Sequence, residues 1–169
     1  MILTNPVVSV NIPATTEEFV VADKIVVNTS ENAEVRIFRI GGKFKDSFGN
    51  KKEQPMAAHM LYGQDLTQRS TDGLLIGELG GKEKAITSWA EVHTLIKAQP
   101  HSSQGLLNVQ NFSSNIFFIP EDDSRPQENV HPVALRYGSS GWDIMVYMPN
   151  STGEWLIGGR VFKRAADAR

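Results

Sequence analysis

The sequence contains no cysteine, and this single absence removes several kinds of chemistry. Without thiols the chain can form no disulfide bond, no thiolate nucleophile and no cysteine-ligated zinc site. A cysteine-free composition fits a reducing compartment, so we expect the protein to be cytoplasmic. At 169 residues the chain is long enough to bury a core without disulfides or structural metal.

Long apolar runs and a secretion signal are also missing. No stretch approaches the roughly 20 apolar residues that a membrane-spanning helix needs. The N-terminus has neither a basic region nor an apolar run of signal-peptide length. We therefore expect no membrane association. The formal net charge of −2 offers no general attraction for nucleic acid, which argues against a nucleic-acid partner.

Motifs for catalysis and cofactor binding are absent as well. The sequence has no G-x-S-x-G, no H-E-x-x-H and no EF-hand loop, and its glycine-rich stretch at 77–82 lacks the spacing of a phosphate-binding loop. The four histidines are scattered and have no partner at metal-ligand spacing: His59, His93, His101 and His131. The sequence thus predicts no catalytic residue, no metal site and no cofactor.

The clearest pattern that is present lies in residues 130–164. Apolar side chains alternate with other residues on either side of a turn at 138–141, as in two strands that each bury one face. A hairpin closed on this turn places Tyr137 opposite Trp142 and keeps apolar residues facing each other along both strands. A second turn at 149–153 leads to a third strand, so the pattern predicts a three-strand C-terminal meander.

The register of the third strand, from about 154 to 163, stays open. A four-residue loop pairs Met148 with Trp155, whereas a five-residue loop pairs Tyr147 with Trp155. The two registers place Trp155 on opposite faces, because a one-residue slip inverts the pattern of a strand. The second register displays Tyr147 and Trp155 together on the outer face.

One amphipathic helix is expected at about 88–99. Ser88 and Glu91 have the spacing of a capping box, in which each side chain satisfies a free backbone N–H of the first turn. Pro100 ends the segment. Its apolar residues fall on one stripe at helical spacing: Trp89, Val92, Leu95 and Ile96.

Together these patterns predict one β-rich α+β domain over residues 1–169. We expect a predominantly antiparallel sheet, or sheets, with the main helix packed on it. A subdivision into N-terminal strands (1–53) and a helix with antiparallel sheet (74–164) is possible. Residues 54–73 are the least regular and are expected to form a long loop or an intersubunit arm. Further strands are expected near 8–12, 19–27, 34–40, 105–110 and 115–119.

Aromatic and hydrogen-bonding side chains gather on or near the predicted meander. Aromatic rings flanked by polar groups suit sugars, bases or a protein partner, although core packing alone would also account for the rings. The candidate ligand-binding residues are Tyr147, Trp155, Asp143, Asn150 and Arg160.

Three functional hypotheses follow. The first is a non-catalytic binding or assembly protein, such as an accessory, regulatory or phage-type structural component, with a protein partner or self-association into a homo-oligomer. The second is a small hydrolase that uses dispersed histidine and carboxylate residues, which requires a pocket where a histidine meets a carboxylate. The third is a module that binds glycan or single-stranded nucleic acid through Tyr147 and Trp155. The sequence favours the first.

Overall fold

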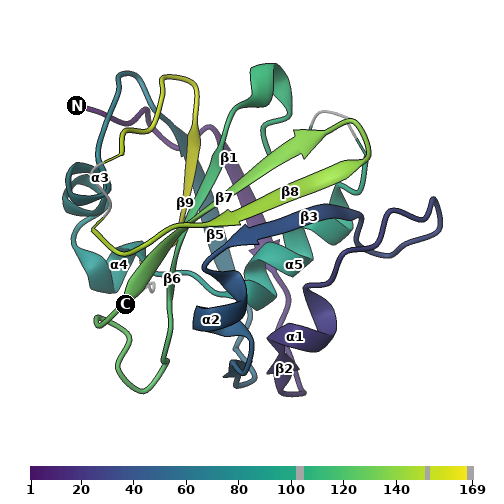
Figure 1. Ribbon diagram of the computed structural model, residues 1–169. Coiled ribbons are helices and arrows are strands. Elements are labelled where there is room, and N and C mark those ends of the chain that lie inside the picture. The colour runs from purple at the N-terminus through teal and green to yellow at the C-terminus, as the bar shows by residue number, and fades with distance from the viewer. Residues whose placement is uncertain (102–104, 151–152, 167–169) are drawn as a thin grey trace.

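A seven-stranded mixed sheet is the centre of the protein, seen in a computed structural model that describes residues 1–101, 105–150 and 153–166 (Figure 1). Its strands are β1 (Val8–Ile12), β3 (Ile37–Gly42), β5 (His59–Asp65), β6 (Asn115–Pro120), β7 (Val130–Gly138), β8 (Gly141–Val146) and β9 (Arg160–Arg164). They lie in the order β1-β5-β9-β6-β7-β8-β3. A separate antiparallel pair consists of β2 (Phe19–Val20) and β4 (Lys52–Glu53).

Short helices cover both faces of the sheet. In Figure 1, α3 and α4 lie to the left of the sheet, and α1, α2 and α5 lie to the right and below. None of the described helices is both long enough and apolar enough to cross a membrane. Their bounds are α1 Val21–Lys24, α2 Phe44–Phe48, α3 Asp72–Glu78, α4 Lys82–Ala85 and α5 Trp89–Ala98, with a 3₁₀ turn, η1, at Gln110–Phe112.

Two apolar cores form, one on each face. On β6, Phe117 and Ile119 face the core built with α1, α2 and α5, whereas Ile116 and Phe118 face the core built with α3 and α4. Successive side chains of a strand point to opposite faces, so a continuously apolar strand needs cover on both sides. The unbroken apolar run at 116–119 therefore reflects the central, doubly covered position of β6.

Two local predictions are confirmed. The β7–β8 hairpin has the expected register, with Tyr137 opposite Trp142. The capping box at the start of α5 is formed in both directions between Ser88 and Glu91. Both features depend on residues close together in the chain, where turn chemistry and periodicity determine the structure.

The predicted predominantly antiparallel sheet is wrong, because the sheet is mixed. Strands β6 and β9 run parallel, and so do β3 and β8. The predicted three-strand meander is also wrong, because the third strand does not pair with β8. The free edge of β8 is occupied by β3, so the chain leaves β8 after Val146 and returns to the sheet as β9, between β5 and β6. Neither predicted register of the third strand occurs.

Other elements differ from the expectation in the N-terminal half. Residues 59–65 form β5, a strand inside the sheet, and not the expected loop or arm. The strand expected at 34–40 is β3, which lies at an edge. Only Phe19–Val20 of the strand expected at 19–27 is extended, and α1 follows at once.

Candidate functional site

Tyr147 and Trp155 come together on the face of the sheet that α3 and α4 cover. Tyr147 follows β8 and stays attached to β7, since its backbone N–H donates to the carbonyl of Pro132 (2.9 Å). Trp155 leaves the sheet and pairs with Ser70, just before α3, through two backbone hydrogen bonds of 2.7 and 3.1 Å. The two rings meet edge to face, with centroids 5.7 Å apart.

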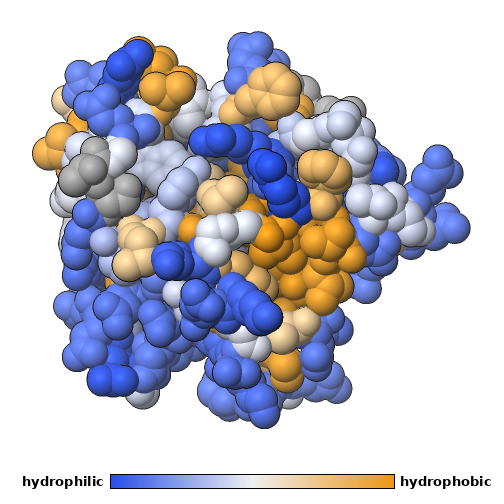
Figure 2. Space-filling model, in the orientation of Figure 1, coloured by the Kyte–Doolittle hydropathy of each residue, from blue (hydrophilic) through white to orange (hydrophobic). Residues whose placement is uncertain are grey.

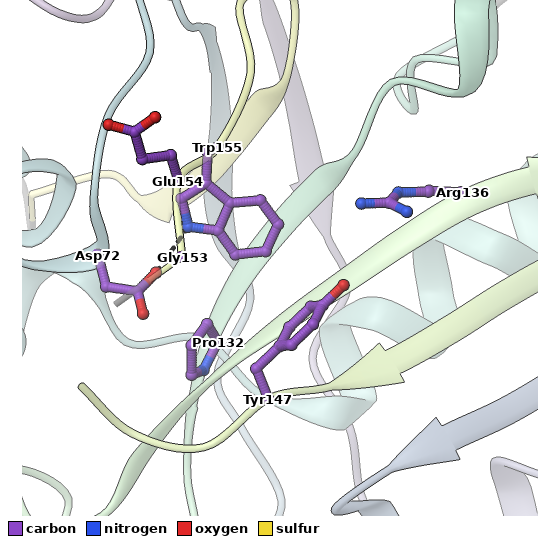
Figure 3. Close-up of a pocket in the computed structure, with 7 residues that line it drawn as sticks. All are labelled: Asp72, Pro132, Arg136, Tyr147, Gly153, Glu154 and Trp155. Atoms are coloured by element: carbon purple, nitrogen blue, oxygen red, sulfur yellow. Dashed lines mark hydrogen bonds between the residues drawn. The ribbon is translucent and has the colours of Figure 1, made fainter. Parts of the chain in front are cut away.

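The two rings line a small cavity of about 110 Å³, which we name the aromatic cavity (Figure 3). Pro132 and Arg136 enter it from β7, and Asp72 enters from the first turn of α3. Three chain segments far apart in sequence therefore build one site. The complete lining is Asp72, Pro132, Arg136, Tyr147, Gly153, Glu154 and Trp155.

A second cavity of about 140 Å³ adjoins the first and shares Asp72 and Pro132 with it. Asp72 and Pro132 therefore lie where the two cavities meet. The other residues of this adjoining cavity are Gly73, Ile76, Lys82, Phe118, Asn129, Val130, Pro149 and Asn150.

Asp72 is held by local structure that the sequence encodes. The side chain of Thr71 caps α3 by accepting a hydrogen bond from the N–H of Leu74 (3.4 Å), which fixes Asp72 at the first helical position. Asp72 is only 6% exposed, and its Oδ1 accepts a 2.6 Å hydrogen bond from Nε1 of Trp155. Burial raises the pKa of the Asp72 carboxyl above its ordinary value, and the Trp155 hydrogen bond only opposes that shift.

Arg136 lies on the opposite side of the two rings from Asp72 (Figure 3). Its Nε donates to Oγ of Ser114 (2.9 Å), and the side chain is otherwise exposed. The Glu154 carboxylate points away from the ring pair toward solvent. The aromatic cavity therefore has a buried carboxylate at one end and an exposed guanidinium at the other.

The structure brings together three of the five candidate residues from the sequence. Tyr147 and Trp155 line the aromatic cavity, and Asn150 lines the adjoining one. Asp143 is instead paired with Arg39 of β3, whose Nε donates to it at 3.0 Å. Arg160 is paired with Asp65 of β5 at 2.6 Å and is also outside both cavities.

Asp72, Pro132 and Arg136 were not among the candidates. Thr71-Asp72 has the composition of a helix start, but nothing near it in sequence shows that Trp155 packs there. That contact depends on the pairing of Trp155 with Ser70, which is distant in sequence.

Two histidines meet carboxylates, which is the arrangement that the hydrolase hypothesis requires. His59 Nε2 lies 2.5 Å from Oε1 of Glu91, and His131 Nε2 lies 3.1 Å from Oε2 of Glu121. The His59 ring also lines an open cavity of about 440 Å³ beside β1 and β5, with Asn11, Ile12, Pro13, Ala58 and Met60.

Neither ring has a nitrogen free to act as a base. Nδ1 of His59 bonds to the carbonyl of Ala57 (2.9 Å), and Nδ1 of His131 bonds to the carbonyl of Tyr147 (2.8 Å). A general base must reach the proton that it removes, and here both ring nitrogens face acceptors within the protein. The geometry assigns these histidines to holding the structure together.

Glu91, the carboxylate partner of His59, also has a structural role. It is fully buried, and beyond His59 it accepts hydrogen bonds from Arg164 (2.8 and 3.1 Å) and from Ser88. Burial by itself would raise the pKa of Glu91, but the bonds from His59 and Arg164 outweigh burial and lower it. Within the described parts of the chain, no group of three or more histidine and acidic side chains is arranged to hold a metal ion.

Four exposed apolar residues stand within two positions in sequence of residues that line the two cavities. Leu74 is next to Gly73, Met148 is next to Tyr147, and Leu156 and Ile157 follow Trp155 in a tight turn closed by the hydrogen bond from Gly159 N–H to the Leu156 carbonyl (3.2 Å). We name this set the apolar rim; its exposed fractions are 57% for Leu74, 55% for Met148, 63% for Leu156 and 65% for Ile157.

A second area of exposed apolar surface lies elsewhere. Figure 2 shows it around β3 and the segment after α1, where Val26, Val27 and Phe38 are exposed. None of the three cavities described above includes Val26, Val27 or Phe38, so this area serves below as a comparison surface.

Comparison of the chain with protein-family models, with curated proteins and with solved structures finds no match. The site itself must therefore carry the functional argument.

Proposed function

We propose that this chain is a non-catalytic binding protein that holds a protein partner on the apolar rim, with one partner side chain inserted into the aromatic cavity. The observation that carries the proposal is the position of the rim: four large apolar side chains, more than half exposed, each within two residues of a cavity wall. Scattered exposed apolar residues are ordinary, but a group around a concave site is typical of an interaction surface.

The size of the aromatic cavity favours a protein partner over a free small molecule at this site. Pockets that enclose drug-sized ligands usually measure about 300–1,000 Å³. The aromatic cavity, at about 110 Å³, is too small for that and suits a single inserted side chain. The buried Asp72 carboxylate disfavours the phosphates of nucleic acid, which weakens the third hypothesis.

The protein that we propose as partner is a different chain, met in the cytoplasm. Self-association is the other form of the binding hypothesis, and native mass separates the two. Light scattering after size exclusion should give the monomer mass of 18.7 kDa at micromolar concentration. If the wild type is instead a dimer or a larger closed oligomer, and the rim variant described below is a monomer, then the rim binds a second copy of the chain.

The proposal is tested by quantitative affinity capture from extracts of the source cells with three baits. The first is the wild type, and the second is the rim variant Leu156→Glu/Ile157→Glu. The third is a matched control, Val26→Glu/Val27→Glu, which adds the same charges to the comparison surface. All four positions are at least 44% exposed, so both variants should fold.

We expect the wild type and the control to recover one protein in similar amounts. The rim variant should recover at least about tenfold less of that protein. The proposal fails if the rim variant recovers the same proteins as the wild type. It also fails if the control variant, and not the rim variant, loses the partner.

A further inference from the structure

Three acidic side chains are buried among the described residues, and two of them have a compensating positive charge. Glu53 lies 3.4 Å from Nζ of Lys51 and also accepts the N–H groups of Trp89 and Ala90 at the start of α5. Glu91 contacts both His59 and Arg164, as described above. A buried charge that lacks such a partner is costly, so these pairings are the normal arrangement.

Asp72 is the exception. Its one hydrogen bond comes from the uncharged Trp155 Nε1–H, and it forms no ion pair with any lysine, arginine or histidine of the described segments. Two cations line the cavities without pairing with Asp72: Lys82 donates to the Gln127 carbonyl (3.2 Å), and Arg136 donates to Ser114. The start of the short helix α3 favours a negative charge there but supplies no countercharge.

The second carboxylate oxygen of Asp72 has no hydrogen-bond partner among the described residues. Asp72 lines both cavities, and only its Oδ1 is occupied, by Trp155. Pro132 lies between Asp72 and Tyr147 in Figure 3, and the Trp155 ring forms the opposite wall. A group that approaches Asp72 through the aromatic cavity is therefore bordered by two aromatic rings.

We propose that Asp72, Trp155 and Tyr147 form a binding site for an organic cation, namely the ammonium group of a lysine side chain presented by the partner. This inference rests on the proposed function and names the side chain that enters the cavity. An ammonium ion next to a buried carboxylate replaces the missing countercharge, and aromatic rings attract the same ion through their electron-rich faces.

The carboxylate oxygen of Asp72 that Trp155 does not contact favours lysine over arginine as the ligand. A guanidinium group binds a carboxylate best through two parallel hydrogen bonds, which need both oxygens. The Trp155 N–H already uses one of the two acceptor positions of Oδ1, so a guanidinium group that approached both oxygens would compete with the indole, whereas an ammonium group needs only Oδ2.

The test is an NMR titration that follows the indole N–H resonance of Trp155, with those of Trp89 and Trp142 as internal references. The probes are N-acetyl-lysine amide, the arginine analogue, and N-acetyl-norleucine amide as the uncharged match for lysine. They are added to the wild type, to Asp72→Asn and to Glu17→Gln, a change at an exposed carboxylate that lines none of the three cavities. Asp72→Asn keeps an oxygen for the Trp155 N–H but removes the charge, and its unfolding temperature verifies that it folds.

We expect the lysine probe to shift the Trp155 resonance saturably and to bind at least about tenfold more tightly than norleucine. Asp72→Asn should weaken lysine binding by about the same factor. Glu17→Gln removes an exposed carboxylate outside the cavities and should change binding by less than about twofold.

Other results overturn the inference in distinguishable ways. Equal binding of lysine and norleucine, or unchanged lysine binding in Asp72→Asn, would show an uncharged anchor and leave the proposed function standing. Tighter binding of arginine would overturn the assignment to lysine. If no probe moves the Trp155 resonance, the cation site is refuted, and a failed capture experiment would be needed to refute the proposed function as well.

Discussion

At the scale of residues, Asp72 is buried without a countercharge, so its protonation state affects the stability of the folded protein. Because burial raises its pKa, the folded protein binds the Asp72 proton more tightly than the unfolded chain does. Stability is therefore lost as the pH rises from the ordinary value of 3.8 through the raised folded value. A group that costs stability when charged is retained in many proteins for a functional reason, and binding is the reason proposed above.

Asp72→Asn should thus be at least as stable as the wild type at neutral pH, measured by thermal or urea unfolding. Any advantage of the variant should shrink as the pH falls below 3.8, because the aspartate is then protonated in both the folded and the unfolded state. Asp72→Ala is the control, because it leaves the buried Trp155 N–H without an acceptor and should cost about 1–3 kcal/mol. A marked loss of stability in Asp72→Asn at neutral pH would mean that the charge is already compensated.

His59 predicts a pH dependence of the opposite kind. The hydrogen bond to Glu91 raises the pKa of His59, and burial opposes that shift. The stabilisation is complete below the ordinary value of 6.5 and is lost as the pH rises through the higher folded value. Wild type should therefore exceed His59→Gln in stability at mildly acidic pH, and urea midpoints should converge as the pH increases.

His93 supplies the control for this measurement. Burial lowers the pKa of His93, which packs edge-on against Phe19, so its protonation opposes folding. His93→Gln should consequently make the protein less sensitive to a fall in pH below 6.5. If His59→Gln and His93→Gln changed the pH profile in the same direction, the assigned role of the His59–Glu91 pair would be wrong.

At the scale of elements, the parallel pairing of β3 with β8 depends on one glycine. Gly42 has φ +68°, and a Cβ at this position would overlap the carbonyl oxygen of Val146. Gly42→Ala should therefore destabilise the protein by about 2 kcal/mol or more, measured by urea unfolding. Gly77→Ala, inside α3 with open space around it, should instead be neutral or stabilise by up to about 1 kcal/mol. Equal effects of the two changes would contradict this structure of the β3 edge.

The elements that the sequence predicts well are those that local chemistry determines. The Ser88–Glu91 capping box and the 138–141 turn each act within a few residues, and the doubly apolar run at 116–119 shows its burial directly. The segments predicted wrongly depend on distant partners. Residues 59–65 have helix-forming neighbours, yet pairing with β1 and β9 makes them a strand.

The candidate site shows the same division. Tyr147 and Trp155 were chosen for their aromatic character, and they do meet, although Trp155 is held by a bridge to Ser70 and not by the predicted meander. Asp72 could not be chosen from the sequence, because its significance comes from burial without a countercharge. Periodicity and motif spacing contain no information on such a tertiary property.

For the molecule as a whole, the two faces of the mixed sheet differ in the core that each one covers. The face covered by α1, α2 and α5 encloses the larger core, which holds Trp89 and Trp142. The face covered by α3 and α4 is completed by Trp155, in the segment that crosses from β8 to β9, and this crossing creates the aromatic cavity and its rim. The departure from a simple meander is thus what generates the candidate binding site.

The most direct test of the account is hydroxyl-radical footprinting of the protein alone and bound to its captured partner. Binding should reduce oxidation at Met148, Leu156 and Ile157 several-fold, and leave Phe112, which is 78% exposed on η1, unchanged. Protection of Val26, Val27 and Phe38 with no change at Met148 would place the partner on the other apolar surface and contradict the account.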